Sequence, residues 1–313
     1  MAADLSRARI AILGCGAVGT ALASDLVRRS RHLGRVPFGG ELVLWSRSRA
    51  SVRRCRNLLA KVAPKRGVPV ESASGLEAAI AGANIALLCV SDDALVATTL
   101  AAGRAVSRGE KPVFLVSSGL QPLEPLRAGL HRGISLGRFH PLTPVLRGAN
   151  LGPSMLHFGI EGDARAQRAA SSLLRHWRAR AVWLVPGKSV AYHAAASLLG
   201  GGVVALFSLA EELMAPAVRS GSDLRQSLMW FADENLFNVL DVGPRRALTG
   251  PLARGSEAVV RAQLRALGCV PHARAAYVAL GEVMLDLAHA RRSIDTATAR
   301  RLRRMLRARP GKR

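Results

Sequence analysis

A glycine-rich segment near the start of the sequence has the spacing of a phosphate-binding turn. Residues 10–13 are apolar, Gly14, Gly16 and Gly19 follow in the pattern G-x-G-x-x-G, and residues 20–27 are compatible with a helix. This order predicts a buried parallel strand, a tight turn and a helix whose N-terminal amides and positive dipole end attract phosphates. The segment therefore predicts dinucleotide binding. A glycine turn in a ligand-free α/β fold is the alternative.

The residues after the next predicted strand, 41–45, indicate which dinucleotide binds. A site for NAD usually carries Asp or Glu at the end of this strand, where the carboxylate binds the ribose hydroxyls. This chain has Ser46, Arg47 and Ser48 there, and a guanidinium can hold a 2′-phosphate by charge-assisted hydrogen bonds. We therefore expect NADP(H). The alternative is that Arg47 is one more surface arginine in an arginine-rich chain.

Residues at the ends of two later strands complete the predicted cofactor site, because carboxyl ends of parallel strands border one crevice in an open α/β sheet. Asp92 and Asp93 also have an ordinary interpretation as caps of the helix that follows them. The predicted cofactor-binding residues are Gly14, Cys15, Gly16, Ala17, Val18, Gly19, Ser46, Arg47, Ser48, Val90, Ser91, Asp92 and Ser117.

One short segment carries side chains suited to reduction of a carbonyl or imine, which needs a hydride donor and a proton donor. Lys188, Tyr192 and His193 lie where a long helix is expected to begin. We predict His193 as the general acid, because an imidazole titrates near neutral pH. Tyr192 could orient a substrate oxygen and Lys188 could polarise a carbonyl. The alternatives are a hydrogen-bonded helix-start histidine, a packed tyrosine ring and a solvated lysine.

The predicted substrate-binding residues lie in other segments. Thr249 and the backbone N–H of Gly250 can bind a carboxylate, with Arg254 as a bidentate partner. A simple Thr-Gly-Pro cap and turn is the alternative. His140 precedes a proline and is therefore expected to be extended, where it shapes the floor of the cleft rather than donating a proton.

These segments are spread over 313 residues with two different halves. Alternating strand and helix signals predict a Rossmann-type α/β domain with a mostly parallel sheet over residues 1–186. The pattern from residue 187 to 313 is helical, with breaks near Gly221, Gly243-Pro244 and Gly268, and predicts an all-α substrate and dimerisation domain. We expect strands at 10–13, 41–45, 68–70, 84–90, 113–116, 137–142, 155–160 and 181–185, and helices at 49–62, 76–80 and 165–178.

Composition limits the class of protein. Nearly half of the residues are apolar (49%), so the chain is not disordered, and its net charge of +24 attracts acidic cofactors and substrates. The four cysteines form no C-x-x-C pair, which argues against a zinc site or a disulfide framework. Residues 1–5 lack the pattern of a signal peptide. We expect reduced thiols, no metal and a cytoplasmic location.

Two stretches could indicate other partners. The apolar stretch 194–210 is short for a bilayer, which needs about 20 residues, and is rich in alanine and glycine. We expect a fully buried helix that packs closely on another helix, as in a homodimer, and no membrane contact. The basic tail 300–309 places Leu302, Met305 and Leu306 on one helical face. We interpret it as a solvated amphipathic helix and expect no nucleic-acid partner; contact with nucleic acid or an anionic surface is the alternative.

The chain resembles the Rossmann-like reductase-related proteins whose C-terminal half is a domain of unknown function, DUF2520. The resemblance rests on the glycine loop, His140-Pro141-Leu142, residues 192–196 and residues 248–255, which lie in the right order and cover nearly the whole chain. It implies an NADP-dependent oxidoreductase fold similar to pyrroline-carboxylate and ketopantoate reductases, dimeric through the helical domain. This chain departs from the family pattern at Ser117, at Leu199-Gly200 and at Ser256.

The sequence therefore predicts an NADP(H)-dependent reductase of a small carbonyl or imine substrate that carries a carboxylate. A 2-oxoacid of the ketopantoate type and a cyclic imine both remain open as substrates. The departures from the family pattern favour a rival, a non-catalytic protein that binds NADP(H) as a sensor or scaffold.

Overall fold

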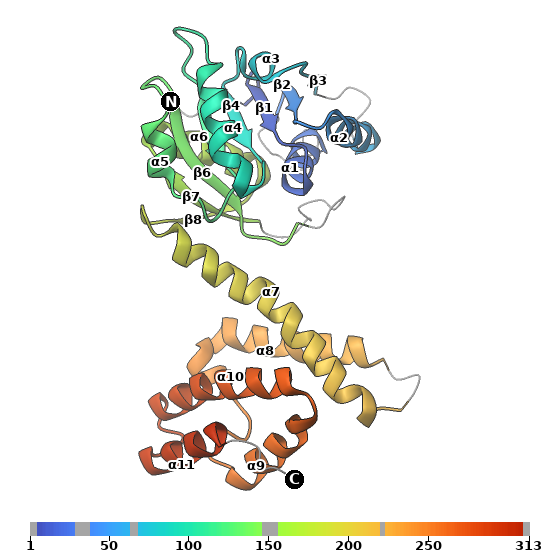
Figure 1. Ribbon diagram of the computed structural model, residues 1–313, viewed down its shortest axis with the longest axis vertical. Helices are drawn as coiled ribbons and strands as arrows, with labels where there is room; N and C mark the ends of the chain where they lie inside the picture. Colours follow the sequence, from blue (N-terminus) through green and yellow to red (C-terminus); the bar gives the residue numbers. More distant parts are fainter. Residues whose placement is uncertain (1–4, 29–37, 63–67, 146–155, 220–222, 309–313) are drawn as a thin grey trace. The chain divides into compact units, whose positions relative to one another are not determined.

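A computed structural model describes residues 5–28, 38–62, 68–145, 156–219 and 223–308 (Figure 1). The chain divides into two compact units, Met1–Ser197 and Leu198–Arg313. The first unit contains the sheet, and the described part of the second is helical. Helix α7 (Ser189–Met214) begins shortly after Pro186-Gly187, where the sequence changes character, and continues from the first unit into the second.

An eight-stranded sheet in the order β3-β2-β1-β4-β5-β6-β7-β8 forms the centre of the first unit. All neighbouring strands are parallel except β6 and β7, so the predicted Rossmann-type, mostly parallel sheet is confirmed. The strand order changes direction between β1 and β4, and ligands bind outside the carboxyl ends of strands at such a point. The strands are β1 (Arg9–Leu13), β2 (Glu41–Trp45), β3 (Val70–Ser72), β4 (Ile85–Leu88), β5 (Val113–Val116), β6 (Ser135–Pro141), β7 (His157–Gly162) and β8 (Arg180–Trp183).

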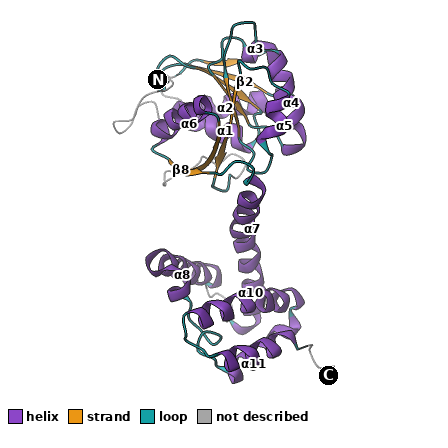
Figure 2. Cartoon of the chain, turned by 90° about the vertical axis from the view of Figure 1, so that its left-hand side faces the viewer, coloured by secondary structure: helices purple, strands orange, loops and turns teal. Residues whose placement is uncertain are grey.

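Helices cover both faces of this sheet (Figure 2). Side chains alternate along β1, so that Ile10 and Ile12 join the core under α1, α2 and α6, while Ala11 and Leu13 join the core under α3, α4 and α5. The helices are α1 (Ala17–Arg28), α2 (Arg49–Val62), α3 (Leu76–Ile80), α4 (Asp92–Arg104), α5 (Leu123–Ala128) and α6 (Ala164–Trp177).

Several elements of the first unit differ from the sequence-based prediction, and β3 and α5 are two examples. Strand β3 begins at Val70 instead of residue 68, because Pro69 has no N–H to donate and contributes only its carbonyl, which accepts a hydrogen bond from Leu42 N–H at 2.9 Å. Helix α5 was not predicted. It has six residues, and Pro122 before it and Pro125 inside it are signals of a turn rather than of a helix.

The second unit has its own small core. Leu302 and Leu306 are fully buried in it, so the predicted amphipathic final helix, α11, is confirmed. The break at Gly243-Pro244 is also found, because Gly243 takes a φ of 75° inside α8. A 3-10 turn at Leu267–Cys269 marks the break near Gly268, and the break near Gly221 falls outside the described residues. The helices are α8 (Leu224–Ala247), α9 (Glu257–Ala266), α10 (Pro271–Ala290) and α11 (Thr296–Arg307).

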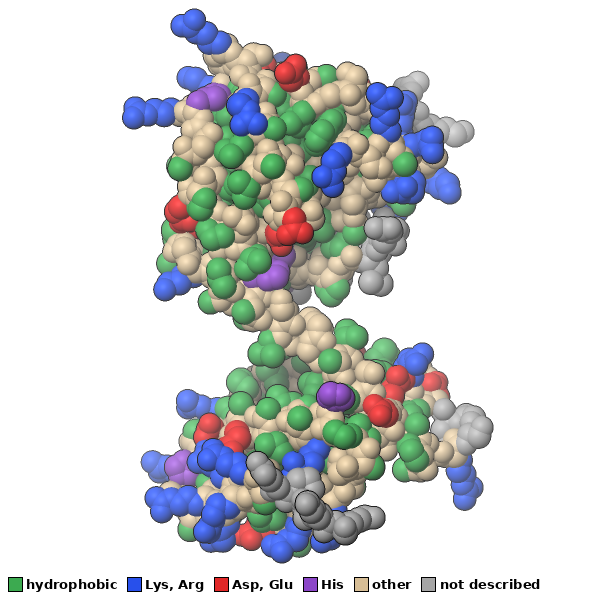
Figure 3. All heavy atoms as spheres, in the orientation of Figure 1, with side chains coloured by type: hydrophobic (Ala, Val, Ile, Leu, Met, Phe, Trp, Pro, Cys, Tyr) green, Lys and Arg blue, Asp and Glu red, His purple; other side chains and the backbone are tan. Residues whose placement is uncertain are grey.

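The apolar stretch 194–210 is helical, but the expectation that it is fully buried is wrong for a single chain. Ser189 is the one buried residue of α7, and α8 has none. By length and composition alone, Ser189–Ala217 is apolar enough to cross a membrane. Many large apolar side chains of α7 and α8 in the second unit are exposed, and Figure 3 shows part of this apolar surface. They are Leu198, Leu199, Val203, Val204, Leu206, Met214, Met229, Trp230, Phe231, Leu236, Phe237, Val239, Leu240 and Val242.

A buried ion pair joins the strands that precede the candidate site. Arg138 on β6 is fully buried, and its Nε donates to Glu161 Oε2 on β7 at 3.2 Å. The two residues lie opposite each other in the antiparallel register. The same guanidinium donates to the backbone carbonyls of Ser118 and Gln121, the latter at 2.6 Å. Arg138 therefore fixes the segment that follows β5.

Substituting Glu161→Gln is expected to lower the free energy of unfolding by about 3 kcal/mol, because it leaves a buried guanidinium charge without its counter-ion. Urea denaturation of both proteins measures the change. The control is Glu257→Gln, which breaks a more exposed pair with Arg301 and should cost less than about 1 kcal/mol. Equal losses in the two variants would contradict this role of the buried pair.

Candidate active site

The glycine loop between β1 and α1 has the geometry that phosphate binding requires. Gly14 takes a φ of 109°, and its N–H donates to the Trp45 carbonyl at the end of β2 at 2.8 Å. A Cβ on Gly19 would stand 1.9 Å from the Gly14 carbonyl oxygen, so only glycine lets the helix approach the turn this closely. Gly16 is exposed, with open space where its Cβ would be. A pyrophosphate can therefore reach the amides at the start of α1.

An arginine-lined pocket of about 590 Å³ lies at the carboxyl end of β2. Its lining includes Arg47 from the loop and Arg49, Arg53 and Arg56 from α2. No carboxylate lines it, and within the described ranges none of the four arginines forms an ion pair. The remaining lining residues are Trp45, Ser46, Val52, Ser72, Ala73 and Ser74. Four uncompensated guanidinium groups beside serine hydroxyls fit a phosphate group.

The sequence reasoning identified Arg47 and Ser46 in this pocket but missed its three arginines from α2. Their positions, 49, 53 and 56, follow the spacing i, i+4 and i+7, which puts them on one face of a helix. That spacing, together with a strand end that lacks an acidic residue, is the signal that could have identified them.

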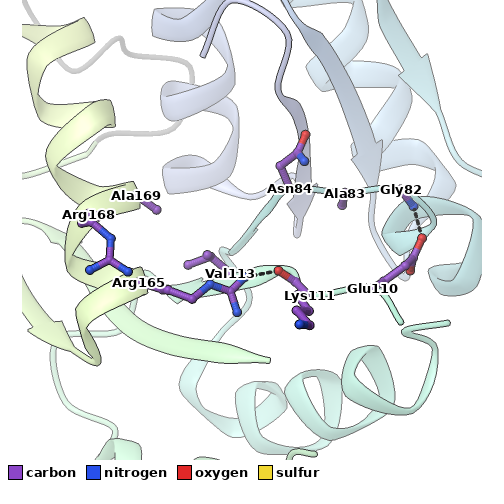
Figure 4. Close-up of a pocket in the computed structure, with 9 residues that line it drawn as sticks. All are labelled: Gly82, Ala83, Asn84, Glu110, Lys111, Val113, Arg165, Arg168 and Ala169. Atoms are coloured by element: carbon purple, nitrogen blue, oxygen red, sulfur yellow. Dashed lines mark hydrogen bonds between the residues drawn. The ribbon is translucent and has the colours of Figure 1, made fainter. Parts of the chain in front are cut away.

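A second pocket, of about 470 Å³, lies at the amino ends of the strands, opposite to the carboxyl ends that border the first pocket (Figure 4). Asn84 precedes β4, Lys111 precedes β5, and Arg165 and Arg168 come from the first turns of α6. The Arg165 guanidinium donates hydrogen bonds to the backbone carbonyls of Gly133 and Lys111. This pocket is at the amino ends of the strands, away from the edge where a doubly wound sheet binds its nucleotide.

Four predicted cofactor residues lie after the carboxyl ends of β4 and β5, namely Val90, Ser91, Asp92 and Ser117. Ser91 is the N-cap of α4 but makes no capping hydrogen bond with its side chain, and Asp92 is in the first turn, so the capping interpretation of Asp92 is not borne out. Ser117 donates through its hydroxyl to the Leu88 carbonyl at 3.1 Å. Cys15 is buried beside Cys55, and a hydrogen bond between the two thiols, together with burial, raises the pKa of Cys15. All four cysteines are free thiols.

Two imidazoles and a phenol meet at the end of β6. His140 Nδ1 lies 2.8 Å from the Tyr192 hydroxyl, and the ring centroids of His140 and His193 are 6.1 Å apart. Tyr192 and His193 lie in the first turn of α7, which Ser189 fixes by donating to the Leu120 carbonyl at 3.1 Å. A Cβ on Gly119 would lie 2.7 Å from Cδ2 of His193. The predicted residues 140, 192 and 193 are therefore brought together.

Burial dominates the electrostatics of this cluster. It lowers the pKa of His140 to about 4, assisted by the charges of His193 and Arg138 and opposed by Asp92. Burial also raises the pKa of Tyr192, against the effects of Arg138 and of a hydrogen bond from the Gly159 N–H. At neutral pH, His140 is an uncharged imidazole and Tyr192 keeps its proton.

Four predicted site residues lie outside this cluster. Lys188 is exposed one turn before Tyr192, whose N–H donates to the Lys188 carbonyl at 3.1 Å. Thr249, Gly250 and Arg254 belong to the second unit, where the Arg254 N–H donates to the Gly250 carbonyl at 3.2 Å in a tight turn. The side chains of Thr249 and Arg254 are exposed. Their roles toward a substrate stay predictions.

Comparison with known proteins places the chain among Rossmann-like folds with a helical C-terminal part. Residues 156–284, from β7 into α10, match the family model of a domain of unknown function, DUF2520, so the resemblance noted in the sequence is confirmed. No curated protein matches the chain.

Solved structures share the fold at low sequence identity. BF3122 from Bacteroides fragilis, proposed to be an NADP oxidoreductase, superposes with a TM-score of 0.67 and 19% identity over 90% of this chain and 99% of its own. Protein TM1727 from Thermotoga maritima gives 0.61 and 19% over the same shares. Pyrroline carboxylate reductase from Plasmodium falciparum, solved with NADP bound, gives 0.56 and 12% over 96% of this chain and 99% of its own.

Proposed function

We propose that the protein is an NADP(H)-dependent oxidoreductase that reduces a small carbonyl or imine substrate bearing a carboxylate. The observation that carries the proposal is the pocket at the end of β2, lined by four arginines and, among the described residues, no carboxylate. A 2′-phosphate is the group that distinguishes NADP(H) from NAD(H), and it needs cationic donors at this place. The open position at Gly16 supports pyrophosphate binding beside it.

A bound NADPH would supply the hydride that adds to the substrate carbon. The chain's own residues would bind the cofactor and the substrate and supply the proton. Loop amides bind the pyrophosphate, the arginines bind the 2′-phosphate, and the imidazoles of His140 and His193 face the reacting group. The electron pair of the C=O or C=N bond moves onto oxygen or nitrogen, which takes a proton from His193. Thr249, the Gly250 N–H and Arg254 are proposed to bind the substrate carboxylate, and Lys188 to polarise a carbonyl.

The structural relatives do not decide the substrate. One of them is a pyrroline carboxylate reductase with NADP bound, which supports the cyclic imine as a candidate. The other candidate, a 2-oxoacid, needs the same hydride, proton and carboxylate site. The cytoplasmic location stays a prediction, and we also propose that the protein is a homodimer, as argued in the Discussion.

The substitution His193→Ala is expected to lower kcat by on the order of a hundredfold or more while changing the affinity for NADPH by less than about twofold. Cofactor-dependent absorbance, followed with a panel of 2-oxoacids and carboxylated cyclic imines, measures turnover, and fluorescence titration measures NADPH binding. The control is His131→Ala, an exposed histidine before β6. Turnover that is unchanged in His193→Ala would remove this residue from the chemistry.

The second candidate is a non-catalytic protein that binds NADP(H) as a sensor or scaffold. The departures at Ser117, Leu199-Gly200 and Ser256 favour it. The same experiment separates the two candidates. Tight NADPH binding with no oxidation by any member of the panel would favour the sensor, and substrate-dependent oxidation would exclude it.

A further inference from the structure

Tyr192 and His140 form a hydrogen-bonded pair across 52 residues of sequence. The hydroxyl oxygen lies 2.8 Å from Nδ1, and the rings meet at 89° with centroids 5.6 Å apart. The hydroxyl also lies against Gly159, which is opposite His140 in the register of β6 and β7, and a Cβ on Gly159 would stand 2.5 Å from the oxygen. A glycine on β7 thus makes room for the hydroxyl beside the imidazole.

The surroundings of the Tyr192 hydroxyl indicate which group donates the hydrogen bond between Tyr192 and His140. Burial keeps the Tyr192 hydroxyl protonated, and the Gly159 N–H donates to its oxygen. The hydroxyl proton needs an acceptor, and in the described part of the chain Nδ1 of His140 is the one within reach. A neutral imidazole that accepts at Nδ1 carries its proton on Nε2.

The groups around His140 keep the ring uncharged. His193 faces it from α7 and Arg138 from its own strand, and both disfavour a positive imidazole, while Asp92 at the start of α4 favours one. Burial is the largest influence, and the pKa of His140 is about 4. The Tyr192 hydroxyl adds no charge. His140 is therefore a neutral ring with one N–H to offer above about pH 5.

The Nε2 edge of His140 faces the turn after β5. A Cβ on Gly119 would lie 3.0 Å from His140 Nε2 and 2.7 Å from His193 Cδ2. Both rings therefore border the side of Gly119 that a side chain would fill. No described residue bonds to Nε2, which leaves this N–H available to a ligand.

We propose that Tyr192 donates a hydrogen bond to Nδ1 of His140 and thereby makes the Nε2–H of His140 the donor to the reacting oxygen or nitrogen of the substrate. This inference rests on the proposed function and divides its chemistry between two histidines. The uncharged His140 polarises the C=O or C=N bond and keeps its proton, and His193 gives up the proton that completes the product. Tyr192 is a positioning residue. A neutral imidazole is an effective electrophile when its orientation is fixed.

Nitrogen-15 NMR of the histidine rings in full-length protein tests this pair without a known substrate. Wild-type His140, identified with a His140→Asn sample, should show Nε2 protonated, Nδ1 accepting a hydrogen bond, and no protonation until the pH falls to about 4. Tyr192→Phe keeps the aromatic ring but removes the donor, so the tautomers should mix and the ring should protonate at a higher pH. Tyr277→Phe is the matched control, because the other tyrosine of the chain bonds Gln263 at 2.8 Å.

Kinetics with an accepted substrate add a second measurement. Tyr192→Phe should lower kcat by about twofold to tenfold, the range that corresponds to one lost hydrogen bond between uncharged groups, while NADPH affinity stays within about twofold. Tyr277→Phe should leave kcat unchanged.

The two proposals fail in different ways. A wild-type His140 that carries its proton on Nδ1, or the same tautomer and titration in wild type and Tyr192→Phe, would overturn the inference and leave the reductase intact. The wild-type spectrum decides the tautomer even if the variant does not fold. A correct tautomer with no NADPH-dependent reduction would overturn the proposed function, and with it the role of His140 toward a substrate.

Discussion

The double substitution Arg47→Ala with Arg53→Ala is expected to lower the affinity for NADPH by on the order of a thousandfold and to leave the affinity for NADH within about threefold of wild type. A charge-assisted hydrogen bond to phosphate contributes about 1.5–3 kcal/mol, and two of them correspond to roughly two to four powers of ten in the dissociation constant. Both residues line the pocket at the end of β2, where a 2′-phosphate is the group that NADH lacks.

Calorimetric titration of both cofactors measures this change of preference. The matched control is Arg54→Ala on the same helix, because Arg54 bonds Ser51 Oγ at 2.9 Å and does not line the pocket. This control removes the same charge from α2. At a salt concentration that screens long-range electrostatic attraction, it should change NADPH affinity less than about threefold. Tighter binding of NADH than of NADPH by the wild type would refute the assignment of the cofactor.

The double substitution Phe237→Glu with Leu240→Glu is expected to convert a homodimer into monomers by weakening association at least a hundredfold. The exposed fractions of these side chains in one chain are 61% and 83%. Burying a large apolar side chain contributes about 1.5–3 kcal/mol, and a two-fold interface loses each contribution twice. Sedimentation velocity measures the mass, and Val259→Glu, an exposed valine on α9, is the control.

A second copy of the chain is the partner that best explains the exposed apolar side chains of α7 and α8. Fourteen large apolar side chains of α7 and α8 are exposed, whereas a monomer surface usually exposes such side chains singly. Carboxylates lie on the same helices, Glu211 and Glu212 on α7 and Asp233 and Glu234 on α8, and a hydrocarbon layer would exclude them. Three consecutive glycines, 200–202, have open space at their Cβ positions, which lets another helix approach closely.

Other results would contradict this assembly. A wild-type mass equal to the 33.2 kDa of one chain would exclude a stable dimer. Recovery in the membrane fraction, with detergent needed for release, would instead assign α7 (Ser189–Met214) to a lipid layer.

The elements that sequence predicted well are those whose signal is local. Strand β2 and helix α2 have the predicted limits, 41–45 and 49–62, because a short apolar run and a helical period each stand between clear breaks. Strand β3 has one partly buried residue, Val70, and two exposed polar ones, so its pairing with β2 sets its limits. The exposure of α7 could not be predicted, since the same apolar run also fits a buried helix.

The same distinction between local and long-range information applies to the candidate site. Glycine spacing and the Ser46-Arg47 strand end predicted the cofactor region, because each belongs to one short segment with a known physical role. The contact between His140 and Tyr192 depends on the register of β6 with β7 and on where α7 begins. No period within either segment contains that information, and His140 was therefore interpreted only as part of the cleft floor.

The buried guanidinium of Arg138 has a consequence for motion. If the segment after β5 moved outward, the buried Arg138 guanidinium would lose its hydrogen bonds to the Ser118 and Gln121 carbonyls, at a cost of about 1.5–3 kcal/mol for each bond. Gating loops are drawn from weakly held parts of a structure. Gly119 therefore lies in a firmly held segment beside the two imidazoles, and we expect an opening that admits substrate or releases product to come from other segments.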